Sequence, residues 1–317
     1  MSTHPLLWLG FNAFVLLMLA FDLGVFHRRN HAVKVREALT WTGVWVVLAL
    51  IFNAGVWIFR GEEAGLQFLA GYLIEKSLSV DNLFIFLIVF STFRVPPLYQ
   101  HKVLFWGVLG ALILRAALIV AGTALLHRFH WTIYLFGGFL VLTGLKLLLQ
   151  KDETPDLRKN IVVRLVRKWL PMTPDYVQGR FLVVENGKRL VTPLFLVLVT
   201  IEFTDLVFAL DSIPAIFAVT PDPFIVYSSN VFALLGLRSL FFALSGVMAL
   251  FSRLKTGLAL ILAFVGVKMI LADTFKIPIG VSLGVIAGIL GLSIAASLLW
   301  PVAERPKETL EPGKEAG

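Results

Sequence analysis

Residues 193–219 read PLFLVLVTIEFTDLVFALDSIPAIFAV, and this stretch decides the fold. It is long enough to cross a membrane, because about 20 apolar residues span the hydrocarbon core of a bilayer. Yet it carries three acids, Glu202, Asp205 and Asp211. An unpaired charge near the bilayer centre costs roughly 2.5–3.5 kcal/mol. The stretch therefore predicts a transmembrane helix whose carboxylates have partners or a function.

Similar apolar stretches recur along the whole chain of 317 residues, of which 58% are hydrophobic and 15% charged. Soluble proteins carry about 25% charged residues. The pattern predicts an all-α polytopic membrane protein with about nine transmembrane helices within residues 1–300. The first apolar run follows no basic segment and is expected to be a helix, not a cleaved signal peptide. The predicted spans are 6–27, 41–59, 66–93, 103–126, 131–149, 193–219, 224–250, 255–273 and 279–300.

The basic residues predict the orientation of the chain. Twenty Lys and Arg fall in one set of alternate connections and three in the other, which predicts an external N-terminus and a cytoplasmic C-terminus. The net charge of +8 is thus a topology signal and does not indicate nucleic-acid binding. Residues 150–192 form a predicted cytoplasmic linker, in which Asn186-Gly187 predicts a β-hairpin. The Glu/Lys/Pro-rich tail 301–317 is expected to be disordered in the cytoplasm.

Eleven charged residues fall inside the predicted spans. Left unpaired, they would cost on the order of 30 kcal/mol, whereas a typical net stability is about 5–15 kcal/mol. Most must therefore pair, contact water or bind an ion; buried ion pairs that only hold helices together are the alternative. We expect Arg115 and Arg238 to neutralise acids of the spans before them, with Lys146 and Lys268 as further charge partners. The full set is Asp22, Glu75, Asp81, Glu202, Asp205, Asp211, Lys76, Arg115, Lys146, Arg238 and Lys268.

The charges follow an internal repeat. In each half an acid is followed six residues later by Asp-Asn or Asp-Ser, then by an arginine in the next span and a Gly-x-Lys in the one after. Spans 3–5 (about 66–149) and 6–8 (about 193–273) are therefore a predicted duplicated three-helix unit, inverted by the charge count. Inverted repeats with a polar site between them are typical of secondary transporters. The matching positions are Glu75 and Asp205, Asp81 and Asp211, Asn82 and Ser212, Arg115 and Arg238, and Lys146 and Lys268.

The polar residues of the spans predict a cation site. Pro214 cannot donate to the carbonyl of Leu210, so a helix break there would free a carbonyl beside Asp211. All candidate ligands are oxygens, which suit Mn²⁺, Mg²⁺ or Ca²⁺ better than softer metals. We expect Asp81 and Asp211 to meet near the midplane and bind one dication. Asn82 and Ser212 would complete the oxygen shell, and Glu75, Glu202 and Asp205 would guide the ion or carry protons.

Three segments are similar to signature segments of the TerC family of bacterial integral membrane proteins. They are residues 21–26 (FDLGVF), 75–82 (EKSLSVDN) and 201–216 (IEFTDLVFALDSIPAI). The resemblance covers roughly residues 5–300 and implies a manganese-efflux transporter of the inner membrane, with Mn²⁺ as the transported ion and no permanently bound cofactor. The residues that it marks as ion-handling are Asp22, Glu75, Asp81, Asn82, Glu202, Asp205, Asp211 and Ser212.

Two other functions are weighed against transport. A membrane factor that assists insertion or metalation of exported proteins would use segment 150–192 as its contact surface. An intramembrane enzyme is disfavoured, because the chain lacks Gly-x-Gly-Asp, His-Glu-x-x-His and Gly-x-Ser-Gly motifs. It also has no cysteine, which excludes thiol catalysis and disulfides. We therefore expect a transporter in contact with the lipid bilayer and with a divalent metal ion.

Overall fold

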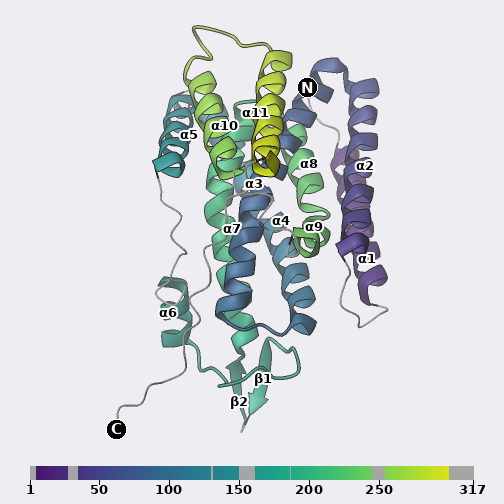
Figure 1. Cartoon of the computed structure of the whole chain (residues 1–317), viewed down its shortest axis with the longest axis vertical. Helices are drawn as coiled ribbons and strands as arrows, with labels where there is room; N and C mark the ends of the chain where they lie inside the picture. Colours follow the sequence, from purple (N-terminus) through teal and green to yellow (C-terminus); the bar gives the residue numbers. More distant parts are fainter. Residues whose placement is uncertain are drawn as a thin grey trace.

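A computed structural model describes residues 5–27, 35–129, 131–149, 161–185, 187–244 and 254–299. These residues form a helical bundle with one small hairpin (Figure 1). The helices are α1 (Pro5–His27), α2 (Val35–Arg60), α3 (Glu62–Thr92), α4 (Pro97–Arg128), α5 (Thr132–Leu149), α6 (Ile161–Trp169), α7 (Pro193–Phe217), α8 (Pro223–Leu234), α9 (Leu237–Leu244), α10 (Leu254–Ile270) and α11 (Ile279–Leu299). The predicted tail 301–317 and residues 150–160 of the linker lie outside the described residues.

The all-α polytopic membrane fold is confirmed. Each predicted span coincides with one helix or, for 224–250, with α8 and α9. Five described helices, α2, α4, α5, α7 and α11, are long and apolar enough to cross a membrane. The pair α8–α9, bent by 40°, makes a sixth if it is one span. The count of nine spans therefore stays a prediction.

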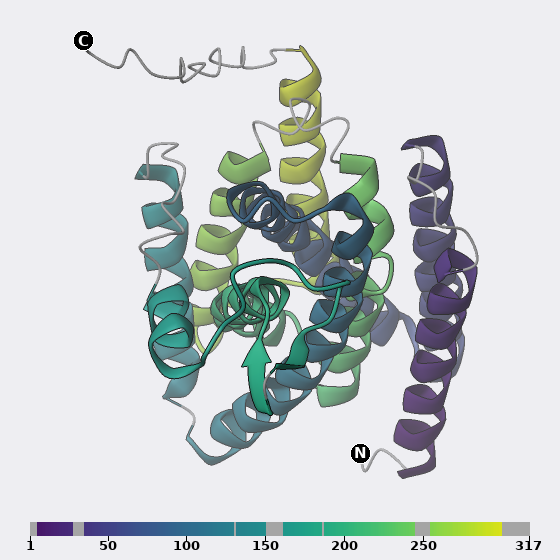
Figure 2. The ribbon, with the colours of Figure 1, turned by 90° about the horizontal axis from the view of Figure 1, so that it is seen from below.

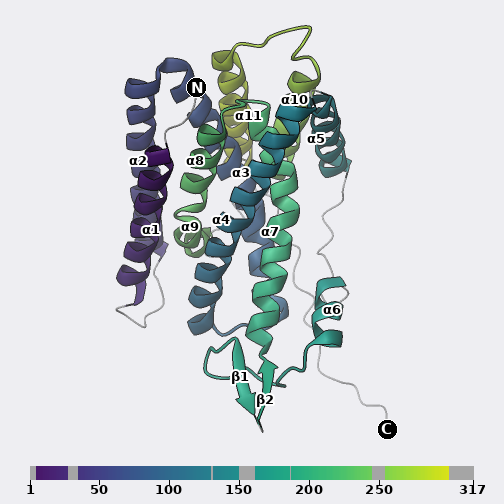
Figure 3. The same ribbon diagram turned by 180° about the vertical axis from the view of Figure 1, so that it is seen from behind.

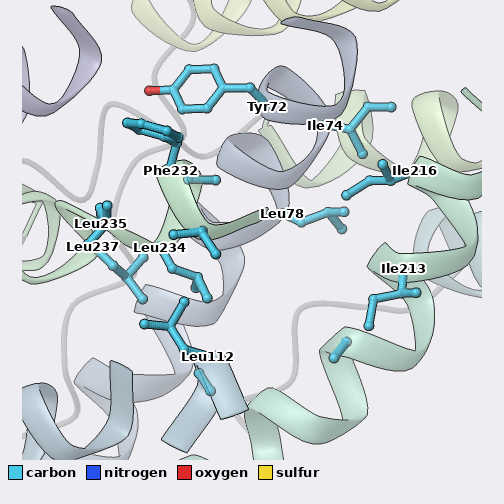
Figure 4. Close-up of a cluster of buried hydrophobic side chains, with 14 of the residues drawn as sticks. Tyr72, Ile74, Leu78, Leu112, Ile213, Ile216, Phe232, Leu234, Leu235 and Leu237 are labelled. Atoms are coloured by element: carbon cyan, nitrogen blue, oxygen red, sulfur yellow. The ribbon is translucent and has the colours of Figure 1, made fainter. Parts of the chain in front are cut away.

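Helices α3, α4, α7 and α8 make the centre of the bundle. Helices α1 and α2 stand together on one flank and α5 on the other, as Figures 1 and 2 show. Helices α5, α10 and α11 gather at the end opposite the hairpin (Figure 3). Buried apolar side chains from α3, α4, α7 and α8 converge between the central helices, with Leu78, Leu112, Ile213 and Phe232 among them (Figure 4). Such contacts hold helices together in lipid, where van der Waals packing replaces the hydrophobic effect.

Helices α5 and α10, the third helices of the two predicted repeats, pack through glycines. A Cβ at Gly144 would lie 2.7 Å from the carbonyl oxygen of Ala259, and one at Gly266 would lie 2.7 Å from that of Gly137. A shift of 122 residues converts the first contact, 144 with 259, into the second, 266 with 137. Such reciprocal contacts are what a two-fold relation between the units requires. They support the inverted repeat, which otherwise remains a prediction.

The structure breaks a different helix from the one that the sequence indicates. Helix α7 continues through Pro214 to Phe217, so the predicted break there is wrong. Pro214 and the residues after it in α7 are buried, and their packing holds the last turn helical although one backbone hydrogen bond is missing. The break falls between α8 and α9, at Gly236, whose φ of +83° is in the left-handed region that favours glycine.

A two-stranded hairpin, β1 (Leu182–Glu185) and β2 (Lys188–Val191), stands where the sequence predicts one. Glu185 pairs with Lys188, and Gly187 has a φ of +74°, as a two-residue hairpin loop requires. The preceding loop docks on the corner between α3 and α4, because the Tyr176 hydroxyl donates to the Phe93 carbonyl at 2.8 Å. Burial raises the pKa of Tyr176 to about 12. The cytoplasmic location of this segment stays a prediction.

Candidate cation site

Arg115 of α4 is the centre of a buried polar cluster. Its guanidinium pairs with carboxylates from both predicted repeats: Glu75 of α3 and Asp205 of α7. It donates two hydrogen bonds to Asp205, from Nε to Oδ2 at 3.3 Å and from Nη2 to Oδ1 at 3.2 Å. All three side chains are at most 3% exposed. The prediction that Arg115 neutralises an acid of the span before it is confirmed, and Asp205 is a second partner.

Neutral polar groups complete this cluster, which we call the Arg115 cluster: Glu75, Asn82, Arg115, Asp205, Ser212 and Asn230. Asn82 donates to Asp205 Oδ1 at 3.1 Å. Arg115 Nη1 donates to Asn230 Oδ1 at 2.9 Å and, more weakly, to Ser212 Oγ at 3.4 Å. Four helices therefore meet at one guanidinium: α3, α4, α7 and α8.

Helical periodicity explains why these residues face one another. Residues seven apart lie on the same face of a helix. Glu75 and Asn82 are seven apart on α3, and Asp205 and Ser212 are seven apart on α7. Helices α3 and α7 thus each contribute one acid and one neutral polar side chain to the Arg115 cluster. The six-residue motif spacing hides this pattern, because the second acid of the α7 motif, Asp211, has its described contact on α5.

Two oxygens of the cluster, Glu75 Oε2 and Asn82 Oδ1, are buried and accept no hydrogen bond from the part of the chain that the structure describes. A buried acceptor without a partner costs about 1–3 kcal/mol, and more when it is charged. With both acids ionised, two carboxylates and one guanidinium leave one negative charge in excess. The cluster thus has free oxygen lone pairs that a cation could use. It also has one excess negative charge, which a cation would offset.

Asp211 lies away from this cluster. Its carboxylate accepts a hydrogen bond from Thr143 of α5 at 3.1 Å, and Lys146 of α5 attracts it. The prediction that Asp211 helps to build one central site is therefore not supported by its contacts, while Lys146 does face an acid. The side chains of Asp22 and Asp81 lie outside the described residues, so their predicted roles remain predictions.

Glu202 sits one turn before Asp205 on α7, against Gly110 of α4. A Cβ at Gly110 would collide with the Glu202 carboxylate, so the glycine makes room for the acid. Glu202 Oε2 is buried and has no hydrogen-bond partner. Glu202 is thus a third carboxylate next to α4, and it is three residues from Asp205, which puts the two acids on neighbouring turns of one face of α7.

The other predicted charge partners lie outside the Arg115 cluster. Arg238 is 4% exposed on α9, directly after the break at Gly236. Repeat 1 has no such break, because α4 runs unbroken past Arg115. Lys268 is part-buried on α10. Pairing of Arg238 with an acid of α7 stays a prediction.

Sequence reasoning missed Asn230 and Thr143. Asn230 is 1% exposed and lies inside the predicted span 224–250. An asparagine inside an apolar span could have indicated its contact with Arg115, because asparagines in membrane helices hydrogen-bond across helices. Thr143 had no comparable signal, since threonine often bonds its own helix. Lys76 was singled out as a buried charge, and it donates to the Ala233 carbonyl of α8 at 3.2 Å.

The donor set fits a hard cation only in part. Among the described residues, no three Asp, Glu, His or Cys side chains come together in a group that could hold a metal ion. The Arg115 cluster offers two carboxylates, with amide and hydroxyl oxygens beside them. Mg²⁺, Mn²⁺ and Ca²⁺ accept such mixed oxygen shells and retain waters.

Comparison with known proteins defines the class of this membrane protein. The integral membrane protein TerC family matches residues 60–305. The chain belongs to that family, as its signature segments predict. It is 59% identical to the uncharacterized membrane protein STKORF319 of Myxococcus xanthus, over 93% of this chain and 92% of that one.

Relatives with a more specific name are slightly more distant. The chain is 49% identical to the "Putative membrane-bound redox modulator Alx" of Salmonella typhi, over 96% of this chain and 97% of that protein. A membrane protein of Rickettsia bellii is 39% identical over 92% of this chain and 97% of its own. No solved structure matches.

Proposed function

We propose that this protein is a transporter, not an enzyme, and that it exports a divalent cation, Mn²⁺ foremost, across the bacterial inner membrane. The observation that carries the proposal is the Arg115 cluster. It is buried, contains only oxygen acceptors and joins helices from both predicted repeats. Two of its oxygens have no partner. Secondary transporters bind their ions at such a repeat interface.

The described contacts revise the predicted ligand set. Glu75, Asp205 and Ser212 accept hydrogen bonds from the same guanidinium, Asn82 donates to Asp205, and these four residues form the proposed primary site. Asp211 and Glu202 flank it on α7, on the α5 and α4 sides respectively. We assign Asp211 and Glu202 to the route of the ion or of a counter-transported proton. The choice of Mn²⁺ rests on the family resemblance, and oxygen-ligand chemistry rests on the residues.

The name of the Alx relatives suggests a redox role, which here would have to be indirect. This chain has no cysteine, so it cannot exchange disulfides itself. Control of the cellular content of a redox-active metal is a route to a redox effect that needs no thiol. The export proposal is therefore compatible with the relatives' name.

Transport by purified protein tests the proposal. Protein reconstituted alone in liposomes should move Mn²⁺ down its gradient, and Glu75→Gln and Asp205→Asn should each abolish the flux. Gln67→Glu is a suitable control, because Gln67 lies near the N-terminal end of α3 and accepts a hydrogen bond from Thr220 there. A factor that assists insertion or metalation of other proteins would move no ion without its partner. Absence of flux for Mn²⁺, Mg²⁺ and Ca²⁺ alike would refute export.

A further inference from the structure

The Arg115 guanidinium occupies the oxygens that a transported dication would need. Its five hydrogen bonds end on Glu75, Asp205, Ser212 and Asn230 oxygens. Glu75, Asp205 and Ser212 are also ligands in the proposed cation site, whereas Asn230 is a partner of Arg115 outside that ligand set. A guanidinium and a metal ion cannot share the same lone pairs. In the described arrangement Arg115 therefore closes the site, and only Glu75 Oε2 and Asn82 Oδ1 are left without a described partner.

Charge balance points the same way. With Arg115 in place, a bound dication would turn one excess negative charge into one excess positive charge. With Arg115 withdrawn, a dication and two carboxylates are neutral together. Because a net charge in a membrane interior is costly, the neutral arrangement is favoured when the cation is bound.

A place for the withdrawn guanidinium exists in the structure. Glu202 has a buried, unpartnered carboxylate oxygen against Gly110 of α4, the helix that carries Arg115. Asp205 and Glu202 are three residues apart on α7, and therefore are neighbours on one face. A long arginine side chain can move between two such neighbours without a shift of the helix.

We propose that Arg115 is a tethered counter-cation that competes with the transported ion. It binds Glu75 and Asp205 when the site is empty, and it moves to Glu202 when a dication takes its place. This inference rests on the export proposal above and says how binding and release of the ion are controlled at that site. The return of Arg115 expels the ion, so a site that binds tightly can still release.

The proposal predicts the sign of three changes in Mn²⁺ affinity. Asn230→Leu keeps the shape and removes an acceptor of Arg115 but neither acid, so the closed state weakens. Loss of one hydrogen bond to a charged group corresponds to roughly tenfold tighter Mn²⁺ binding. Arg115→Lys should act in the same direction, because an ammonium has three donors and cannot form the bidentate pair. Glu202→Gln should weaken Mn²⁺ binding, because it removes the alternative partner.

Titration of purified full-length protein in detergent with MnCl₂ tests this. Ser79→Ala is the matched control, because Ser79 is buried on α3 and its hydroxyl bonds only its own helix, at Glu75 O. Tighter binding by Asn230→Leu and Arg115→Lys, weaker binding by Glu202→Gln and unchanged binding by the control would support the proposal. Weaker or unchanged binding by Asn230→Leu at an unchanged unfolding temperature would overturn it, since a purely structural arginine predicts that sign. Failure of the wild-type protein to bind Mn²⁺, Mg²⁺ or Ca²⁺ would refute export itself.

Discussion

Asp205 and Asp211 occupy the same helix and the same motif, yet the structure predicts very different consequences of neutralising them. Asp205 accepts two hydrogen bonds from Arg115 and one from Asn82, using both carboxylate oxygens. In Asp205→Asn one oxygen becomes an NH₂ group, so a donor faces a donor in a fully buried site. Breaking a buried ion pair in this way costs about 3–5 kcal/mol.

Asp211→Asn should destabilise the protein much less than Asp205→Asn. Asp211 is only part-buried and accepts one described hydrogen bond, from the Thr143 hydroxyl, which an asparagine oxygen also accepts. We expect a loss of at most about 1 kcal/mol, within the range of a single neutral hydrogen bond.

Thermal unfolding in detergent, followed by tryptophan fluorescence, measures the difference. For a protein of this size about 1 kcal/mol shifts the midpoint by roughly 2–4 °C, so Asp205→Asn should lower it by about 6–20 °C and Asp211→Asn by at most about 4 °C. The control is Glu63→Gln, an exposed acid at the start of α3. Equal midpoints for the two aspartate variants would show that the Arg115–Asp205 pair does not hold the bundle together, and the reasoning would fail.

Three further predictions concern packing, docking and topology. Gly144→Ala should destabilise the α5–α10 contact by about 1–3 kcal/mol in an unfolding assay, because its Cβ would meet backbone atoms of Ala259 and Ala263, whereas Gly138→Ala meets nothing within 4 Å and should be neutral. Tyr176→Phe should speed proteolysis of segment 171–192, by about fivefold for a hydrogen bond worth about 1 kcal/mol. Since burial raises the pKa of Tyr176 to about 12, its contribution is fully present below pH 10 and is lost as the pH rises toward 12, so the wild-type rate of opening should be flat from pH 6 to 9. A cysteine introduced at position 186 of this cysteine-free chain should resist an impermeant reagent added outside intact cells; labelling there would contradict the charge-based orientation and the inverted repeat with it.

The sequence predicts the helices well because hydropathy depends on composition alone. Lipid requires each spanning segment to satisfy its own backbone, so an apolar run of sufficient length becomes a helix whatever its neighbours. The two-residue hairpin loop is equally local, because Gly187 supplies the positive φ that the turn needs. The break in α8–α9 is the exception. Gly236 is one of 25 glycines, and only tertiary packing decides which of them leaves the helix.

The site was harder to predict, because the two motifs suggest a pairing that the described contacts of Asp211 do not support. Their shared six-residue spacing suggests that the second acids, Asp81 and Asp211, form the centre. Six residues on a helix turn by about 240°, however, so the two acids of one motif cannot both face the same partner. Arg115 pairs with the first acid of each motif, and the residue seven positions later joins the same cluster. The arginine was recognised from its place in the repeat, but its choice between the acids depends on which face of α4 packs between α3 and α7. The first and the second acid of the α7 motif therefore have different contacts. The first acids, Glu75 and Asp205, pair with Arg115, while Asp211 accepts a hydrogen bond from Thr143 of α5; in the proposed transporter the first acids would hold the cation, and Asp211 would lie where an ion or proton arrives or leaves.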